Sequence, residues 1–482
     1  MKIIHQTFHF MTIQKDKENL MYVIFLAAVA ALGGFLFGYD TAVISGTIGS
    51  VSTQFGLNDV STGWYVGCAL VGSIIGVAVA GKLSDHFGRK GVLVFSAILF
   101  TSSGIGCMFS GSISDLVIYR IVGGIGIGVA SVISPLYISE ISVSRYRGTL
   151  VSLYQLAITI GFVGAYLVNY AISEYAVHMK ALGTVTGFWG KYIVNETWRG
   201  MLGAEAIPAL LFFIILFFIP ESPRWLVLKS KEASALKTLK RIYGTEMANQ
   251  QVADLNNVVH SEEKSDWRIL FQPGFRIALF IGVSLAILGQ FMGVNAVLYY
   301  GPSIFQQTGL SEGDSLFYQV LVGLVNFGST IVAMVVIDKI GRKKLVYYGV
   351  SGMIVSLILI GFYFTLNKVS NVVPPITLLI LILFYIFSCA ISICVVIWVL
   401  LSEMYPARVR GLAMSAAGFS LWIGTFLIGQ LTPWLMTTLS PAGVFWLFGL
   451  MCIPYLYITW KFVPETTGKS LEDIERMWQK EK

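Results

Sequence analysis

Long apolar stretches separated by short polar segments run along almost the whole chain. A helix needs about 20 residues to cross a bilayer, so each stretch is long enough for one membrane span. Six stretches precede a charged segment at 220–274, and six follow it. The pattern predicts an all-α membrane protein with twelve transmembrane helices. The expected spans lie near 21–46, 61–81, 91–111, 114–138, 149–172, 200–219, 275–299, 317–337, 345–366, 375–401, 412–437 and 442–463.

The charged segment divides the predicted spans into two bundles of six helices. Within it, Ser234–Tyr243 and Met247–Val259 carry apolar residues at helical spacing, so we expect short amphipathic helices at the membrane surface. The expected domains are an N-terminal segment 1–20, a bundle 21–219, a linker 220–274, a second bundle 275–463 and a tail 464–482.

Composition and charge agree with this class. Hydrophobic residues make up 56% of the chain and charged residues only 12%, whereas a soluble domain has about 25% charged residues. Most of the 33 Lys and Arg residues fall on one side of the predicted membrane, and an excess of these residues marks the cytoplasmic side. We therefore expect both termini in the cytoplasm and a location in the plasma membrane, as in the inner membrane of a bacterium.

Other classes of function lack a signal in the sequence. No His or Cys cluster, nucleophile elbow or metal-ligand spacing occurs, so an enzyme is not expected. All five cysteines lie in apolar runs, so neither a disulfide nor a metal site is expected. The glycine-rich run at 123–128 lies inside a span and is typical of close helix packing, not of a nucleotide loop. No cofactor is expected apart from a proton as coupling ion.

Three polar signatures occur once in each half and in the same order, which indicates an internal duplication. Each copy lies at a cytoplasmic helix end, where Asp, Glu and Arg can pair across neighbouring helices and hold the two bundles together. We expect these charges to form an inner gate; the alternative is that they only orient the spans. The gate would comprise Asp85, Arg89, Glu140, Arg147 and their repeats Asp338, Arg342, Glu403 and Arg410. The third signature is Pro220-Glu221, which returns as Pro464-Glu465.

Three charged residues lie inside predicted spans: Asp40, Arg120 and Glu205. At 1.5 Å rise per residue, each is roughly 8 to 9 Å below the outer boundary, so the three can meet. A charge inside a membrane costs at least about 2.5 to 3.5 kcal/mol and usually serves transport or proton relay. We expect Asp40 to carry a coupled proton, because Arg120 favours its carboxylate and desolvation favours its neutral acid. Glu205 would assist as a relay or tune Arg120; alternatively, Asp40 is structural.

Amides and aromatic rings inside the spans suit a sugar, which has many hydroxyls and one apolar ring face. Gln290 and Asn295 are five residues apart, about 140° on an ideal helix, and share a face only if the helix breaks near Gly293. Tyr299 lies one turn after Asn295 and is placed to close the outer side of such a site.

Several strings resemble hallmarks of the sugar porters of the major facilitator superfamily, most of all the bacterial D-xylose:proton symporters. They include Pro135–Glu140, Pro220–Leu226 and Pro464–Lys469. The resemblance implies proton-coupled uptake of a monosaccharide, xylose or a related pentose or hexose, by alternating access. It also implies the membrane lipid as surroundings, no nucleic-acid partner and action as a monomer. Sugar-contacting positions would be Phe37, Gln155, Gln290, Asn295, Asn326, Trp398 and Trp422.

Four features depart from that family's pattern and leave the substrate open. Gly289 precedes Gln290 in place of a second glutamine, and Phe162 and Leu421 replace glutamines of spans 5 and 11. Cys394-Val395 stands where a Gly-Pro pair is expected, which weakens the expectation from the resemblance that span 10 bends. A passive facilitator of a sugar or polyol is the first alternative function, and a non-transporting sugar sensor is the second.

Overall fold

The computed structural model describes residues 19–183, 185–261, 268, 271, 275–370, 373–405, 410–463 and 465. Twelve helical segments in this part of the chain are long and apolar enough to cross a membrane, which confirms the predicted number. The expected N-terminal segment, apart from its last two residues, and the expected tail, apart from Glu465, lie outside the described residues.

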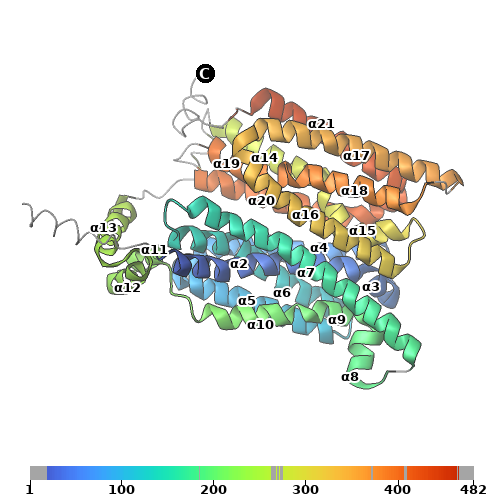
Figure 1. The fold of residues 1–482 in the computed structure, drawn as a ribbon, viewed down its shortest axis with the longest axis horizontal. Helices are drawn as coiled ribbons and strands as arrows, with labels where there is room; N and C mark the ends of the chain where they lie inside the picture. The colour runs from blue at the N-terminus through green and yellow to red at the C-terminus, as the bar shows by residue number, and fades with distance from the viewer. Residues whose placement is uncertain are drawn as a thin grey trace, which may run out of the picture.

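Two groups of helices lie side by side, the N-terminal half in blue to green and the C-terminal half in yellow to red (Figure 1). The N-terminal half contains α2 (Leu20–Val43), η1 (Ile44–Gly46), α3 (Ile48–Phe55), α4 (Asp59–Phe87), α5 (Arg89–Phe109), α6 (Ile113–Ile141), α7 (Arg147–Leu182), α8 (Gly187–Trp189), η2 (Gly190–Asn195), α9 (Thr197–Ala204) and α10 (Ala206–Leu216). The C-terminal half contains α14 (Phe275–Phe291), α15 (Val294–Gln306), α16 (Glu312–Ile340), α17 (Arg342–Ser370), α18 (Pro375–Ala390), α19 (Ile393–Met404), α20 (Arg410–Thr438) and α21 (Ser440–Phe462).

The linker forms the two amphipathic helices that its pattern predicts, α12 (Glu232–Tyr243) and α13 (Thr245–Ser261). A short helix that was not predicted, α11 (Pro223–Leu228), precedes them. In α12, Leu239 and Ile242 are buried, whereas Lys237 is exposed. The backbone N–H of Asn19 donates to the carbonyl of Ile242 at 2.8 Å, which attaches α12 to the start of α2. We call the end of the bundles that carries these helices the linker end, and the opposite end, with α3, α8 and η2, the distal end (Figure 1).

Glycines let helices of the N-terminal bundle approach closely. A Cβ at Gly38 of α2 would lie 2.8 Å from the carbonyl carbon of Ile158 in α7, and one at Gly124 of α6 would lie 2.7 Å from that of Ala69 in α4. No side chain fits at either position without moving backbone. The glycine-rich run is therefore a packing surface for α4, as the sequence predicts.

Three of the spans in the described part of the chain are interrupted by residues outside an α-helix. Span 6 breaks at Glu205, between α9 and α10, and span 7 breaks at Met292 and Gly293, between α14 and α15. Gly293 has φ of 90°, a left-handed conformation that favours glycine. The expected break near Gly293 is thus confirmed.

Span 10 also breaks, at Ile391 and Ser392, although the Gly-Pro pair that would favour a bend is absent. The hydroxyl of Ser392 donates to the carbonyl of Ser388 at 2.6 Å. The backbone N–H of Ser392, which would bond to that carbonyl in a regular α-helix, donates to the carbonyl of Cys389 at 3.2 Å. Gly349 of α17 leaves the room, because a side chain there would overlap Ser392. A serine and a glycine on a neighbouring helix therefore produce the break without a Gly-Pro pair.

Hydrogen bonds join the two bundles in their distal halves. Thr437 of α20 donates to Asp59 of α4 at 2.8 Å, and the Gln430 amide donates to the carbonyl of Val60 at 3.0 Å. Tyr166 of α7 donates to the carbonyl of Leu298 in α15 at 2.9 Å. The structure is therefore closed at the distal end.

Candidate functional site

The three charged residues within the spans meet inside the N-terminal bundle. Asp40 of α2, Arg120 of α6 and Glu205, at the break of span 6, are 0%, 2% and 1% exposed. Arg120 Nη1 donates to Asp40 Oδ1 in a buried ion pair. Glu205 is close enough to interact electrostatically with both. The structure thus brings together the groups that their common depth suggested would meet.

The cluster has polar atoms left over. Asp40 Oδ2, Arg120 Nε and Glu205 Oε1 are buried, and none of them has a hydrogen-bond partner among the described residues. A Cβ at Gly123 would lie 3.1 Å from Asp40 Oδ2 and 2.9 Å from Ser103 Cβ, so this glycine leaves space beside the carboxylate. Buried polar atoms without partners are costly, which favours a bound water or proton there. Ser103 was not anticipated from the sequence.

The break in span 7 assembles a second polar group at the side chain of Gln290. Asn295 Nδ2 donates to Gln290 Oε1 at 2.7 Å, although five residues separate the two. Thr425 Oγ1 of α20 donates to the same oxygen at 3.1 Å. Sequence reasoning missed Thr425, whose only signal is its position one turn after Trp422.

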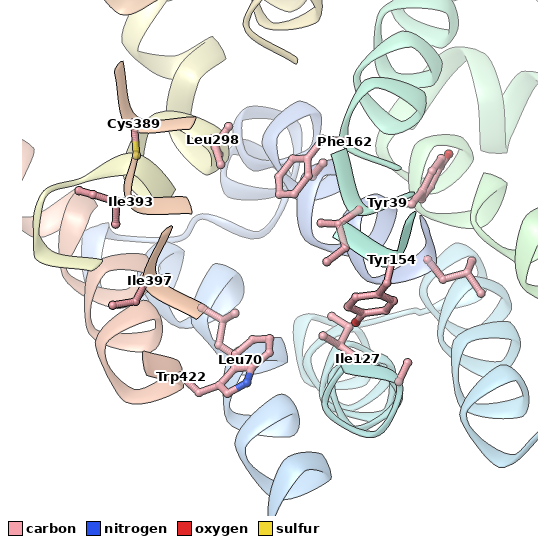
Figure 2. Close-up of a cluster of buried hydrophobic side chains, with 14 of the residues drawn as sticks. Tyr39, Leu70, Ile127, Tyr154, Phe162, Leu298, Cys389, Ile393, Ile397 and Trp422 are labelled. Carbon is pink, nitrogen blue, oxygen red and sulfur yellow. The ribbon is translucent and has the colours of Figure 1, made fainter. Parts of the chain in front are cut away.

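Aromatic rings from both bundles lie beside one another. The rings of Phe37 in α2 and Trp422 in α20 have centroids 5.6 Å apart. Figure 2 shows Trp422 with Ile393 and Ile397 of the C-terminal half, across from Phe162 and Tyr154 of the N-terminal half. The two isoleucines come from α19, and sequence reasoning did not identify them.

The remaining candidate sugar contacts lie on other helices. Tyr299 of α15 is buried close to Gly429 of α20. Gln155 of α7 is half-buried, Asn326 of α16 is buried and Trp398 of α19 is 39% exposed. None of these last three makes a side-chain hydrogen bond to another described residue. The structure therefore does not join them to the Gln290 group by direct contact.

The two halves repeat one ion-pair geometry at the linker end. Arg89 of α5 makes two hydrogen bonds to Glu140 of α6, with Nε–Oε2 of 2.9 Å and Nη2–Oε1 of 3.0 Å. Arg342 of α17 repeats this with Glu403 of α19 at 3.2 Å and 2.9 Å. Asp85 Oδ1 lies 3.5 Å from Arg89 Nη1, and the side chain of Asp85 is 77% exposed.

A further carboxylate supports each pair. Glu221 accepts hydrogen bonds from the backbone N–H groups of Arg89 and Lys90, at 2.9 and 3.1 Å. Glu465 accepts from Arg342 and Lys343, both at 3.2 Å. Each carboxylate thus sits on the N-terminus of a helix, where unpaired N–H groups favour negative charge. Burial raises the pKa of Glu221, and the N–H donors oppose that effect. The repeated Pro-Glu pair was the sequence signal for this role.

Among the described residues, each ion pair of the gate charges lies within one bundle, and the inner gate stays a prediction. Arg89 and Glu140 both belong to the N-terminal half, and Arg342 and Glu403 both belong to the C-terminal half. Arg147 is exposed and forms no ion pair with a described residue. The side chains of Asp338 and Arg410 lie outside the described residues. With the distal end closed, the Arg89–Glu140 pair and the Arg342–Glu403 pair each stabilise their own bundle.

The geometry combines a buried charged cluster in one bundle, a polar group at a broken helix in the other and closure between the bundles. Residues 26–478 match the family described as "Sugar (and other) transporter". The chain belongs to this sugar transporter family. It is a membrane transporter with twelve spans, its activity is sugar transport, and it is not an enzyme.

The similar proteins cover almost its full length. It is 37% identical over 465 residues to the arabinose-proton symporter of Bacillus subtilis, covering 96% of each chain. It is also 37% identical over 496 residues to the D-xylose-proton symporter of Escherichia coli, covering 96% of this chain and 97% of that one. The inward open conformation of the xylose transporter XylE from E. coli matches with a TM-score of 0.81 and 36% identity, over 95% of this chain and all of that one. The fold is accordingly that of the major facilitator superfamily.

Proposed function

We propose that this sugar transporter is a proton-coupled symporter that carries a monosaccharide, xylose or a related pentose or hexose, into the cell by alternating access. The observation that carries the proposal is the buried Asp40–Arg120 ion pair beside Glu205, with one oxygen of each carboxylate unpaired. The relatives named as proton symporters for arabinose and xylose support it.

Counting charges explains why this cluster suits a proton. It contains two carboxyl groups and one guanidinium, all buried, so full ionisation leaves one uncompensated negative charge. Such a charge is expensive away from water, and one proton removes it. When Asp40 takes the proton, Arg120 is free to pair with Glu205, and the contact between α2 and α6 changes. Proton binding is thereby linked to helix packing.

The polar group of span 7 suits a sugar hydroxyl. In the structure, Gln290 Oε1 is satisfied by Asn295 and Thr425, so a sugar binds by exchanging these hydrogen bonds for its own. The rings of Phe37 and Trp422 come from opposite bundles and offer an apolar surface for the sugar ring. Sugar contacts on both bundles would couple binding to their relative movement.

The proposal fixes an orientation in the membrane. The linker end and both termini face the cytoplasm of a plasma membrane, as the distribution of Lys and Arg indicates. The distal end then faces outward, and its closure corresponds to an inward-facing state. In the outward-facing state, the linker-end charges approach one another across the two bundles and form the inner gate. The transporter would act as a monomer.

The test is uptake into proteoliposomes across a panel of pentoses, hexoses and polyols, with and without an imposed pH gradient. Accumulation above equilibrium only with the gradient supports symport. Equilibration that ignores the gradient indicates a passive facilitator, and binding without flux indicates a sensor. Either of the last two results contradicts the proposal.

Substitution separates the proton site from the sugar site. Asp40→Asn removes the titratable group but keeps its shape, so accumulation is lost while sugar exchange across the membrane continues. Asp254→Asn, on the exposed face of α13, is the matched control and keeps both activities. An Asp40→Asn variant that still concentrates sugar excludes Asp40 as the coupling residue.

A further inference from the structure

The break in span 10 brings two cysteines together. Cys389, in the last turn of α18, and Cys394, in the first turn of α19, have their Sγ atoms 3.6 Å apart. Both are free thiols; Cys389 is buried and Cys394 is half-buried. Their positions in one apolar stretch gave no hint of this pairing, since a continuous span was expected to run through both.

The contact exists only because the helix is interrupted. Residues five apart on a continuous helix are turned about 140° from each other and lie about 7.5 Å apart along the axis, so their side chains diverge. Cys389 and Cys394 have this spacing, as do Gln290 and Asn295 across the break of span 7. In each case, the break converts diverging positions into neighbours. Straightening span 10 would separate the two sulfur atoms.

The surroundings give the two thiols different access. Cys394 is four residues before Trp398, so both lie on the same face of α19, and Trp398 is 39% exposed. Cys389 is enclosed, and Figure 2 shows it next to Ile393 in the core. The other three cysteines, Cys68, Cys107 and Cys452, are buried and have no thiol within hydrogen-bond distance among the described residues. Cys394 is therefore the thiol that a small reagent reaches first.

We propose that Cys389 and Cys394 form a dithiol modification site, in which oxidation by a peroxide creates a disulfide across the break of span 10. The Cys394 sulfur attacks one peroxide oxygen, the O–O bond breaks, and a sulfenic acid and water form. The Cys389 sulfur then attacks the sulfenic sulfur, the S–S bond forms, and the S–O bond breaks with loss of a second water. The two sulfurs together lose two electrons, and the peroxide gains them.

The disulfide locks the geometry of the span. It would draw the sulfurs from 3.6 Å to bonding distance, about 2.05 Å, a small movement for two side chains at a break. The α18 segment packs mainly on α16 and α17, whereas α19 also packs on α14 and α20. A covalent bond between α18 and α19 therefore fixes the position of α16 and α17 relative to α14 and α20, so alternating access is arrested. This effect on transport rests on the proposed function, whereas formation of the disulfide does not.

The experiment treats the full-length protein in proteoliposomes with hydrogen peroxide. Mass spectrometry of the peptide containing both cysteines is expected to show the loss of two hydrogen atoms, reversed by dithiothreitol. Sugar uptake is expected to fall in proportion to the oxidised fraction and to return on reduction. Cys389→Ser and Cys394→Ser are each expected to keep their uptake under peroxide, and Cys452→Ser to behave like the unaltered protein.

A second probe covers the case in which a serine variant folds poorly. Phenylarsine oxide bridges two neighbouring thiols, so it is expected to add once to the unaltered protein and to Cys452→Ser, but not to either variant of the pair. Absence of both the disulfide and the arsenic adduct overturns the site. A disulfide that forms but leaves sugar uptake unchanged overturns the proposed arrest of alternating access. Exchange of labelled sugar serves as the transport readout, so failure of proton coupling is distinguished from failure of this proposal.

Discussion

A methyl group at one glycine is expected to open the distal end. Gly63 lies in α4 where this helix meets α20, and a Cβ built there would lie 2.9 Å from the carbonyl carbon of Gln430 and closer still to its oxygen. Ordinary van der Waals contact begins near 3.4 Å. The obstacle is backbone, which cannot rotate away, so Gly63→Ala requires α4 and α20 to separate by more than half an ångström.

The cost falls on one conformation only. Overpacking of this kind costs about 1–3 kcal/mol, and the clash disappears when the distal ends of the bundles part. The ratio of distal-closed to distal-open molecules should therefore fall by roughly 5- to 150-fold. The matched control is Gly81→Ala on the same helix, where an added methyl meets nothing within 4 Å.

The assay is a distance measurement between spin labels by double electron–electron resonance. Val60 and Leu439 are exposed at the distal end of opposite bundles and can carry the labels as cysteines, in a background whose native cysteines are serines. We expect a longer distance to become populated in Gly63→Ala and not in Gly81→Ala. Identical distributions in both variants would show that the α4–α20 contact does not set the conformation.

Three further substitutions test other parts of the structure. Arg89→Ala leaves the buried carboxylate of Glu140 without its counter-charge and should lower the free energy of unfolding by about 3–5 kcal/mol. Replacement of the exposed Arg147 by alanine should change it by no more than about 0.5 kcal/mol. Equal shifts of the two variants in thermal unfolding would contradict this. Gly293→Ala must hold a side chain at φ of 90° against a buried phenylalanine ring, so it should lower stability by at least about 1–3 kcal/mol, and an unchanged melting temperature would argue against the break as described. Thr425→Val removes a donor that orients the amide of Gln290, so calorimetry should show sugar affinity weakened by about 0.5–1.5 kcal/mol; unchanged affinity would remove Thr425 from the site.

Breaks in the spans show how far sequence reasoning reaches. The break in span 7 was predictable because its cause is local: Gly293 lies between two amides that need a common face. The break in span 10 was not, because part of its cause, Gly349, lies on another helix and becomes adjacent to Ser392 only in the folded chain. A break that has a local cause can be predicted from the sequence, whereas a break that depends on a neighbouring helix can be explained only once the packing is known.

Charges show the same division. Depth along a helix follows from residue number, so Asp40, Arg120 and Glu205 could be placed at one level before their contact was seen. The partners of Arg89 and Arg342 could not be assigned, because pairing within or between bundles depends on the conformational state, and one sequence encodes both states. Residue type and position thus identify where charges gather, and the conformation determines which of them touch.

The attachment of the linker has a practical consequence for measurement. The Trp225 indole N–H donates to the carbonyl of Asp85, and the backbone N–H of Asn19 donates to the carbonyl of Ile242 in α12. The linker helices are therefore attached to the N-terminal bundle and move with it. Lys237 is exposed on linker helix α12, and Lys344 is exposed on the C-terminal bundle. Fluorophores at these two positions would convert the rocking of one bundle against the other into a change in energy transfer. The cycle could then be followed in real time without a label near the sugar.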